Sequence, residues 1–154
     1  MITVKTGDLL SARETIIAHQ VNCMGAAGGL AAAIFERWPD AENDYYQVID
    51  RCRDAGGVGF ALAGTSQLTG RQKDGHIIAN LFGQVYPGAD YRPMLLKHAL
   101  EMLATIAKAG GWSVALPYKL SCGICGGDWN EVQDIIHETM QGVDCVIYKK
   151  DGVQ

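Results

Sequence analysis

The chain has 154 residues, of which 48% are hydrophobic and 19% charged, and its formal net charge is -4. This size and composition are typical of one globular domain with a sizeable core, and no apolar run approaches the roughly 20 residues of a membrane span. An acidic balance without a basic run argues against a protein that binds nucleic acid through general charge.

Strand and helix signals alternate along the chain. Short runs rich in Val, Ile and aromatic residues predict strands at 2–5, 16–20, 60–63, 76–81, 113–116 and 145–148. Apolar residues at spacings of three and four, together with Pro39, predict helices at 30–37, 41–52, 91–109 and 129–140. This order predicts an α/β layered domain with a largely parallel sheet, whose ligands bind beyond the carboxyl ends of the strands.

The first glycine-rich loop, "HQVNCMGAAGGLAAAIF" at 19–35, follows a strand and opens a helix. Its glycines allow close backbone approach to a ligand, and the helix start presents free N–H groups to an anion. The spacing fits neither a Walker A loop nor a dinucleotide fingerprint. The loop predicts either an anion site or a tightly packed turn.

The second loop, "SCGICGGDWNEV" at 121–132, contains a Cys-x-x-Cys pair and a helix start. Asp128 and Glu131 form an Asp-x-x-Glu capping box, so the helix is expected to begin at Trp129. The glycine pair then separates Cys122 and Cys125 from the helix, which disfavours a thioredoxin-like redox site. No second cysteine pair completes a zinc site, and consecutive backbone N–H groups remain as an anion nest.

Five cysteines, an odd count, and an N-terminus without a secretory pattern favour reduced thiols in the cytoplasm. Neither a metal nor a cofactor is expected. No interaction with a membrane is expected, and nothing in the sequence indicates more than a monomer.

Four segments occur in the order "GDLL", "HQVNCMGAAGGLAAAIFERWP", "LPYKLSCGICGGDW" and "CVIY". Together they resemble the macrodomain family, whose members bind ADP-ribose. The resemblance is to small bacterial and phage macrodomains and to the branch of the yeast ADP-ribose-1''-phosphate phosphatase and the terminal ADP-ribose protein glycohydrolase. It implies a single macrodomain over 1–154, a three-layer α/β/α sandwich with a six-stranded mixed sheet.

The resemblance also assigns binding roles. Asp8 would accept a hydrogen bond from the adenine amino group, the amide of Leu9 would contact the same ring, and Asn22 would contact the distal ribose. Tyr148 would help to wall the adenine, with a plain core role as the alternative. The remaining ADP-ribose-binding residues implied are Cys23, Gly28, Gly29, Leu30, Pro117, Ser121, Cys122, Gly123, Ile124, Cys125 and Gly126.

The resemblance defines the catalytic candidates less completely. The family glycohydrolase uses a lysine that "NLFGQVYPGADYRP" lacks, and Cys125 occupies its aspartate position. His19 matches a histidine of the phosphatase branch and could act as general base or acid, with backbone hydrogen bonding as the alternative. Asn22 is a further catalytic candidate, and Asp90 with Gln84 could orient the attacking water.

Three functions stay open at this point. The first is a macrodomain that binds ADP-ribose and hydrolyses a derivative of it, either the 1''-phosphate or an ADP-ribosyl or acetyl ester. The second is a non-catalytic reader of ADP-ribose on a small molecule or macromolecule, with no direct contact to nucleic acid beyond the ADP-ribosyl group. The third is a thiol-redox protein that uses Cys122 and Cys125.

Overall fold

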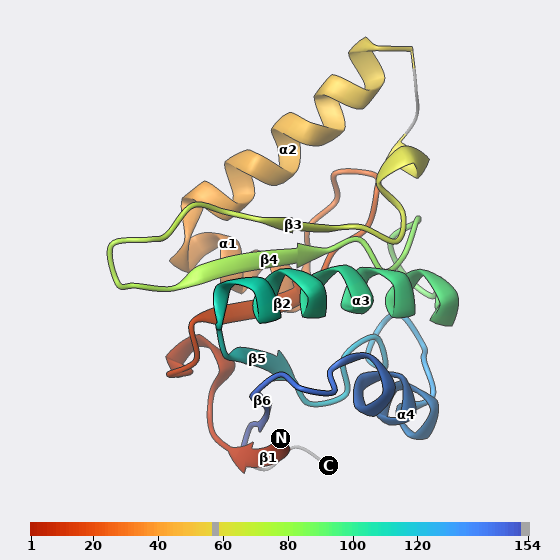
Figure 1. The fold of residues 1–154 in the computed structure, drawn as a ribbon. Helices are drawn as coiled ribbons and strands as arrows, with labels where there is room; N and C mark the ends of the chain where they lie inside the picture. Colours follow the sequence, from red (N-terminus) through yellow and green to blue (C-terminus); the bar gives the residue numbers. More distant parts are fainter. Residues whose placement is uncertain (57–58, 152–154) are drawn as a thin grey trace.

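A computed structural model describes residues 1–56 and 59–151. Its centre is a six-stranded sheet in the order β1-β6-β5-β2-β4-β3 (Figure 1). Every neighbouring pair is parallel except β3 with β4, which is antiparallel at one edge. The sheet is therefore mixed but mostly parallel, as expected. The strands are β1 (Ile2–Thr6), β2 (Ile16–Gln20), β3 (Ser66–Leu68), β4 (Ile77–Leu81), β5 (Val114–Pro117) and β6 (Cys145–Lys149).

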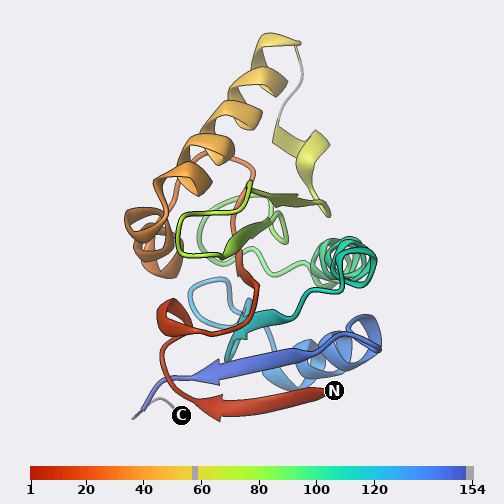
Figure 2. The same ribbon diagram turned by 60° about the vertical axis from the view of Figure 1, so that its left-hand side comes forward.

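Helices cover both faces of the sheet and complete an α/β/α sandwich (Figure 2). Two of the helices begin at a proline, which lacks the N–H that a first helical turn leaves unpaired. The Asp128 side chain accepts a hydrogen bond from Asn130 N and so caps the last helix at its expected start. The helices are α1 (Gly29–Arg37), α2 (Pro39–Asp54), α3 (Pro93–Gly110) and α4 (Trp129–Thr139), with short 3-10 helices η1 (Leu9–Ser11) and η2 (Gly59–Leu62).

Strand β2 shows how the two cores form. Successive side chains of a strand point to opposite faces, so Ile16 packs in the core under α3 and α4, and Ile17 packs in the core under α1 and α2. Both residues are completely buried. A strand covered on both faces reads as a continuous apolar run, which explains why the sequence predicts β2 with its correct bounds.

The strand expected at 60–63 is wrong, because these residues lie in and just after η2. Phe60 is 46% exposed, so the short apolar run does not reflect burial on two faces of a sheet. The strand that the sequence does not predict is β3, at one edge of the sheet. Its three residues, Ser66–Leu68, pair with β4. Its sequence, Ser-Gln-Leu, is too short and too polar to produce a strand signal.

Among residues 1–56 and 59–151, no helix combines the length and the apolar character needed to cross a bilayer.

The carboxyl ends of the parallel strands all lie on the same side of the sheet. The two glycine-rich loops follow β2 and β5, which are neighbours, so this side brings the two loops together.

Candidate functional site

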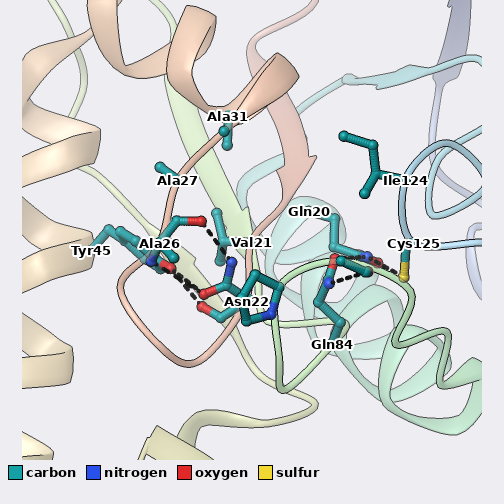
Figure 3. A pocket seen from close by; sticks show the side chains of 13 residues that line it. Gln20, Val21, Asn22, Ala26, Ala27, Ala31, Tyr45, Gln84, Ile124 and Cys125 are labelled. Carbon is teal, nitrogen blue, oxygen red and sulfur yellow. Dashed lines mark hydrogen bonds between the residues drawn. The ribbon is translucent and has the colours of Figure 1, made fainter.

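A groove opens between the two glycine-rich loops. It consists of an inner cavity of about 230 Å³, which reaches toward Asn22 and Tyr45, and an outer cavity of about 460 Å³, which runs along 117–125. The two cavities are adjacent, because they share lining residues from both loops. Figure 3 shows the side chains that line the inner cavity. The shared residues are Gln20, Gly28, Ala31, Gln84, Ile124 and Cys125.

Asn22 holds the first loop in shape from the wall of the inner cavity. Its Oδ1 accepts hydrogen bonds from Met24 N at 3.0 Å and Ala26 N at 3.4 Å, and its Nδ2 donates to Ala26 O at 2.8 Å. The buried Tyr45 hydroxyl donates to Asn22 O at 2.7 Å and lies 3.0 Å from Oδ1. Asn22 therefore organises the loop as well as lining the cavity.

This network makes Asn22 testable. We expect Asn22→Ala to lower the free energy of unfolding by about 1 kcal/mol, because it leaves two backbone donors and one acceptor of the loop unpaired. Ligand affinity should fall five- to tenfold as the loop loosens. Urea unfolding and calorimetry measure the two effects separately, with Asn130→Ala on the exposed first turn of α4 as the control. A variant with unchanged loop stability and affinity would contradict this role.

The start of α1 provides donors at the groove. Gly28 is the N-cap residue, and because it has no side chain, no side-chain oxygen accepts from the first N–H groups of the helix. Gly29, with a φ of 54°, begins the helix. The first N–H groups of a helix have no partner within it, and the helix dipole adds partial positive charge there. A Cβ added at Gly28 would meet no atom within 4 Å. The glycine therefore leaves open space beside these donors.

The second loop is strained in a manner common at binding sites. Lys119 and Ser121 have φ values of 59° and 67°, which non-glycine residues rarely adopt. Across the described residues, no acceptor in the chain receives the N–H groups of Gly123, Ile124 or Cys125. These three residues line the outer cavity, at the place where the sequence predicts an anion nest.

Gly127 closes the base of the second loop. Its N–H donates to Ser121 O at 2.9 Å, and an added Cβ would lie 2.6 Å from that oxygen and 2.7 Å from the Tyr91 ring. No larger residue fits this contact without movement of the loop backbone. The glycine pair therefore shapes the nest instead of extending the helix.

Three polar side chains meet on the wall of both cavities. Gln20 Nε2 donates to Gln84 Oε1 at 2.7 Å and lies 3.5 Å from Cys125 Sγ (Figure 3). Gln20 Oε1 is buried and has no hydrogen-bond partner in the described structure. These contacts fix the Gln20 side chain on the groove wall, and Gln20 is not among the site residues that the sequence predicts.

The residues expected to contact adenine lie at or near the carboxyl ends of β1 and β6. Asp8 comes after β1 and caps η1 by accepting from Leu10 N, and Leu9 is buried in the core. The Tyr148 hydroxyl donates to Glu14 at 2.6 Å, and its ring would lie 3.3 Å from a Cβ at Gly7. Neither cavity reaches these side chains. Asp8 follows β1, and Tyr148 lies in β6 beside Pro117 of β5, which lines the outer cavity.

The structure does not bring His19 into the groove. Its side chain is completely buried, with Nε2 2.6 Å from Asn80 Oδ1 and the ring packed edge-on against Phe35. Burial lowers the pKa of His19 to about 4, although the Asn80 hydrogen bond opposes the shift. A neutral imidazole in the core cannot reach a water in the groove. Gln20, the next residue on the strand, faces the groove in its place.

Asp90 also lies outside the cavity walls. Its Oδ2 accepts from Val85 N and Tyr86 N at 2.9 Å each, and both oxygens accept from Arg92 Nε. Burial opposes ionisation, but these backbone donors and the guanidinium hold the pKa of Asp90 below its ordinary value. Asp90 therefore fixes the loop after β4 instead of orienting a water.

The cysteines show no redox geometry. Cys23 is buried, and its thiol donates a hydrogen bond to Gln84 O at 3.4 Å. Burial raises the pKa of Cys23 to about 11. Burial also raises the pKa of Cys122 to about 11, which makes its thiolate scarce at neutral pH. All five cysteines are free. Across 1–56 and 59–151, no group of three His, Cys, Asp or Glu side chains could hold a metal ion.

The comparisons with known proteins agree with this geometry. No protein-family model matches the chain. The DNA ADP-ribosyl glycohydrolases of Mycobacterium tuberculosis and Mycobacterium bovis are 30% identical over 156 residues, which cover 99% of this chain and 43% of the relative. The chain therefore spans less than half the length of these curated relatives.

Solved structures extend the similarity to the fold. The macrodomain of M. tuberculosis DarG has a TM-score of 0.80 and 28% identity, over 96% of this chain and 97% of that one. Thermosipho africanus DarTG, solved in complex with ADP-ribose, has a TM-score of 0.73 and 20% identity, over 92% of this chain and 39% of that one. The fold is an α/β/α sandwich, and its groove lies between two glycine-rich loops. The chain has the macrodomain fold.

Proposed function

We propose that the chain binds ADP-ribose in the groove and releases it from a macromolecule, with DNA as the first substrate to test. The observation that carries binding is the pair of glycine loops, which line one groove and include backbone N–H groups without a partner within the described chain. A diphosphate needs such donors in a protein of net charge -4. DNA is chosen because the Mycobacterium relatives are named as DNA ADP-ribosyl glycohydrolases.

In this proposal the two loops hold the diphosphate, and the distal ribose enters the inner cavity beside Asn22. The outer cavity, which Pro117 and Lys119 help to line, would hold the adenosine half. Lys119 adds one positive charge near the phosphates. The remaining contacts of the adenine follow the roles that the family resemblance implies for Leu9 and Tyr148.

Release of the ADP-ribosyl group is a hydrolysis at the anomeric carbon of the distal ribose. A water oxygen bonds to that carbon, the bond to the modified base breaks, and its electron pair and a proton end on the base. In the described residues no Asp, Glu or His side chain lines either cavity. The chain would therefore act by holding the ribose and orienting the water through the amides of Gln20 and Asn22.

The same observation favours a second candidate, a reader that binds ADP-ribose without hydrolysing its linkage. The two candidates are separated by incubating the protein with an oligonucleotide that carries an ADP-ribosyl group on a base and following free ADP-ribose over time. ADP-ribose-1''-phosphate and an O-acetyl ester serve as further substrates. Catalytic release supports the hydrolase, and tight binding without product from any substrate supports the reader.

A further inference from the structure

An exposed aromatic cluster lies beside the mouth of the inner cavity. Phe60 of η2 and Tyr86 of the loop after β4 are each 46% exposed, and their ring centroids are 5.9 Å apart at 83°. These two segments lie side by side at the end of the sheet where the groove opens (Figure 1). Pro87 and Gly88, the next residues after Tyr86, line the inner cavity. The cluster and the cavity are thus adjacent.

A guanidinium completes this surface. Arg92 Cζ lies 5.9 Å from the centroid of the Tyr86 ring, and the Arg92 side chain is 44% exposed. Arg92 Nε lies 3.0 Å from Asp90 Oδ1, so the two side chains form an ion pair. In the described part of the chain, no hydrogen bond involves the terminal Nη atoms of Arg92. These Nη atoms are therefore available to a phosphate even though Asp90 offsets part of the charge.

The surface is also held in place before any partner arrives. Gln84 Nε2 donates to Tyr86 O at 2.6 Å, and Asp90 accepts from the N–H groups of Val85 and Tyr86. Gln84 belongs to the groove wall, so the loop that carries Tyr86 is tied to the cavity. Large exposed aromatic side chains fixed in this way are unusual unless they meet a partner.

We propose that Phe60, Tyr86 and Arg92 form a platform that binds single-stranded nucleic acid next to the ADP-ribosylated nucleotide. A base adjacent to the modified one would stack on the exposed aromatic rings, and its phosphate would bind Arg92 Nη. Stacking needs no basic surface, which suits an acidic protein. The inference rests on the proposed function for the position of the modified nucleotide. It replaces the expectation that nucleic acid is contacted through the ADP-ribosyl group alone.

The test uses the full chain and fluorescence anisotropy with short unmodified single-stranded DNA and RNA at low salt. We expect Tyr86→Ala and Phe60→Ala each to weaken strand binding about tenfold, since one stacked base contributes about 1–3 kcal/mol. Tyr86→Trp should retain the affinity, and Val4→Ala, an exposed apolar residue on the opposite edge strand β1, should not change it. Arg92→Gln should reduce the salt dependence by about 0.7 in log-log slope.

A parallel titration with free ADP-ribose separates this inference from the proposed function. Tyr86→Ala should change ADP-ribose affinity less than twofold, because its side chain lies outside the cavity walls. Strand binding that is absent in the native chain, or that Tyr86→Ala leaves unchanged, would overturn the platform whether or not ADP-ribose binds. Preferential binding of DNA or of RNA identifies the strand that the platform accepts, and either preference supports it.

Discussion

Gly28→Glu is expected to weaken ADP-ribose binding by at least 100-fold while leaving the fold intact. Gly28 has a φ of -147°, which any residue adopts, and an added Cβ meets no protein atom within 4 Å. The new carboxylate would point into the groove beside the start of α1, where the diphosphate is proposed to bind. Two like charges within about 4 Å repel by several kcal/mol at a partly buried site.

Isothermal titration with ADP-ribose measures this effect, and thermal unfolding confirms that the variant is folded. Gly28→Gln separates size from charge, and we expect it to bind more tightly than Gly28→Glu. Gly70→Glu is the matched control, because Gly70 also has open space around a Cβ and lies in the β3–β4 connection, away from the groove. If Gly28→Glu kept native affinity, the diphosphate could not lie between the two loops.

His19 is expected to make the protein less stable in mild acid. Its pKa falls to about 4 in the fold from an ordinary value of 6.5, chiefly because of burial. Between these values the unfolded chain binds more protons, so the stabilisation is complete above about pH 6.5 and is lost as the pH falls toward 4. This difference in proton binding lowers the free energy of unfolding by about 2 kcal/mol between pH 7 and pH 5.

Guanidinium unfolding at pH 7 and pH 5 measures this loss in the native chain and in His19→Gln. The variant should lose about 2 kcal/mol less over the same interval, because its side chain does not titrate. His137→Gln, at an exposed position in the last turn of α4, should leave the native pH dependence in place. An equal loss in native protein and His19→Gln would show that His19 does not stay neutral in the core.

The sequence predicts most of the fold because its buried strands are continuous apolar runs. The exceptions lie at one edge of the sheet, where Ser66–Leu68 gains its strand conformation from pairing with β4 and not from its own residues. The 60–63 run shows the reverse error, since its apolar residues lie in and just after the 3-10 helix η2, with Phe60 exposed. Local composition cannot distinguish these cases, because tertiary pairing decides them.

The features of the site that depend on local sequence could likewise be predicted, and those that depend on tertiary structure could not. The loops were visible in the sequence because glycine spacing and helix starts are local signals, and Gly28, Gly29, Ser121 and 123–125 line the groove, whereas Cys23, Cys122 and Gly126 line neither cavity. The direction of individual side chains was not visible. His19 and Gln20 are adjacent, and strand alternation turns one into the core and the other into the groove. Tyr45 comes from α2, and only the folded chain places it against Asn22.

A calorimetric titration of the native chain with ADP-ribose, in reducing buffer and with AMP and ribose-5-phosphate as comparisons, tests the central claim most directly. The groove predicts a dissociation constant near or below about 10 μM, about -7 kcal/mol, and much weaker binding of AMP, which spans half of the groove. No heat from ADP-ribose, and no competition by ADP-ribose against a labelled analogue with a folded protein, would contradict the assignment of the two loops as a diphosphate site.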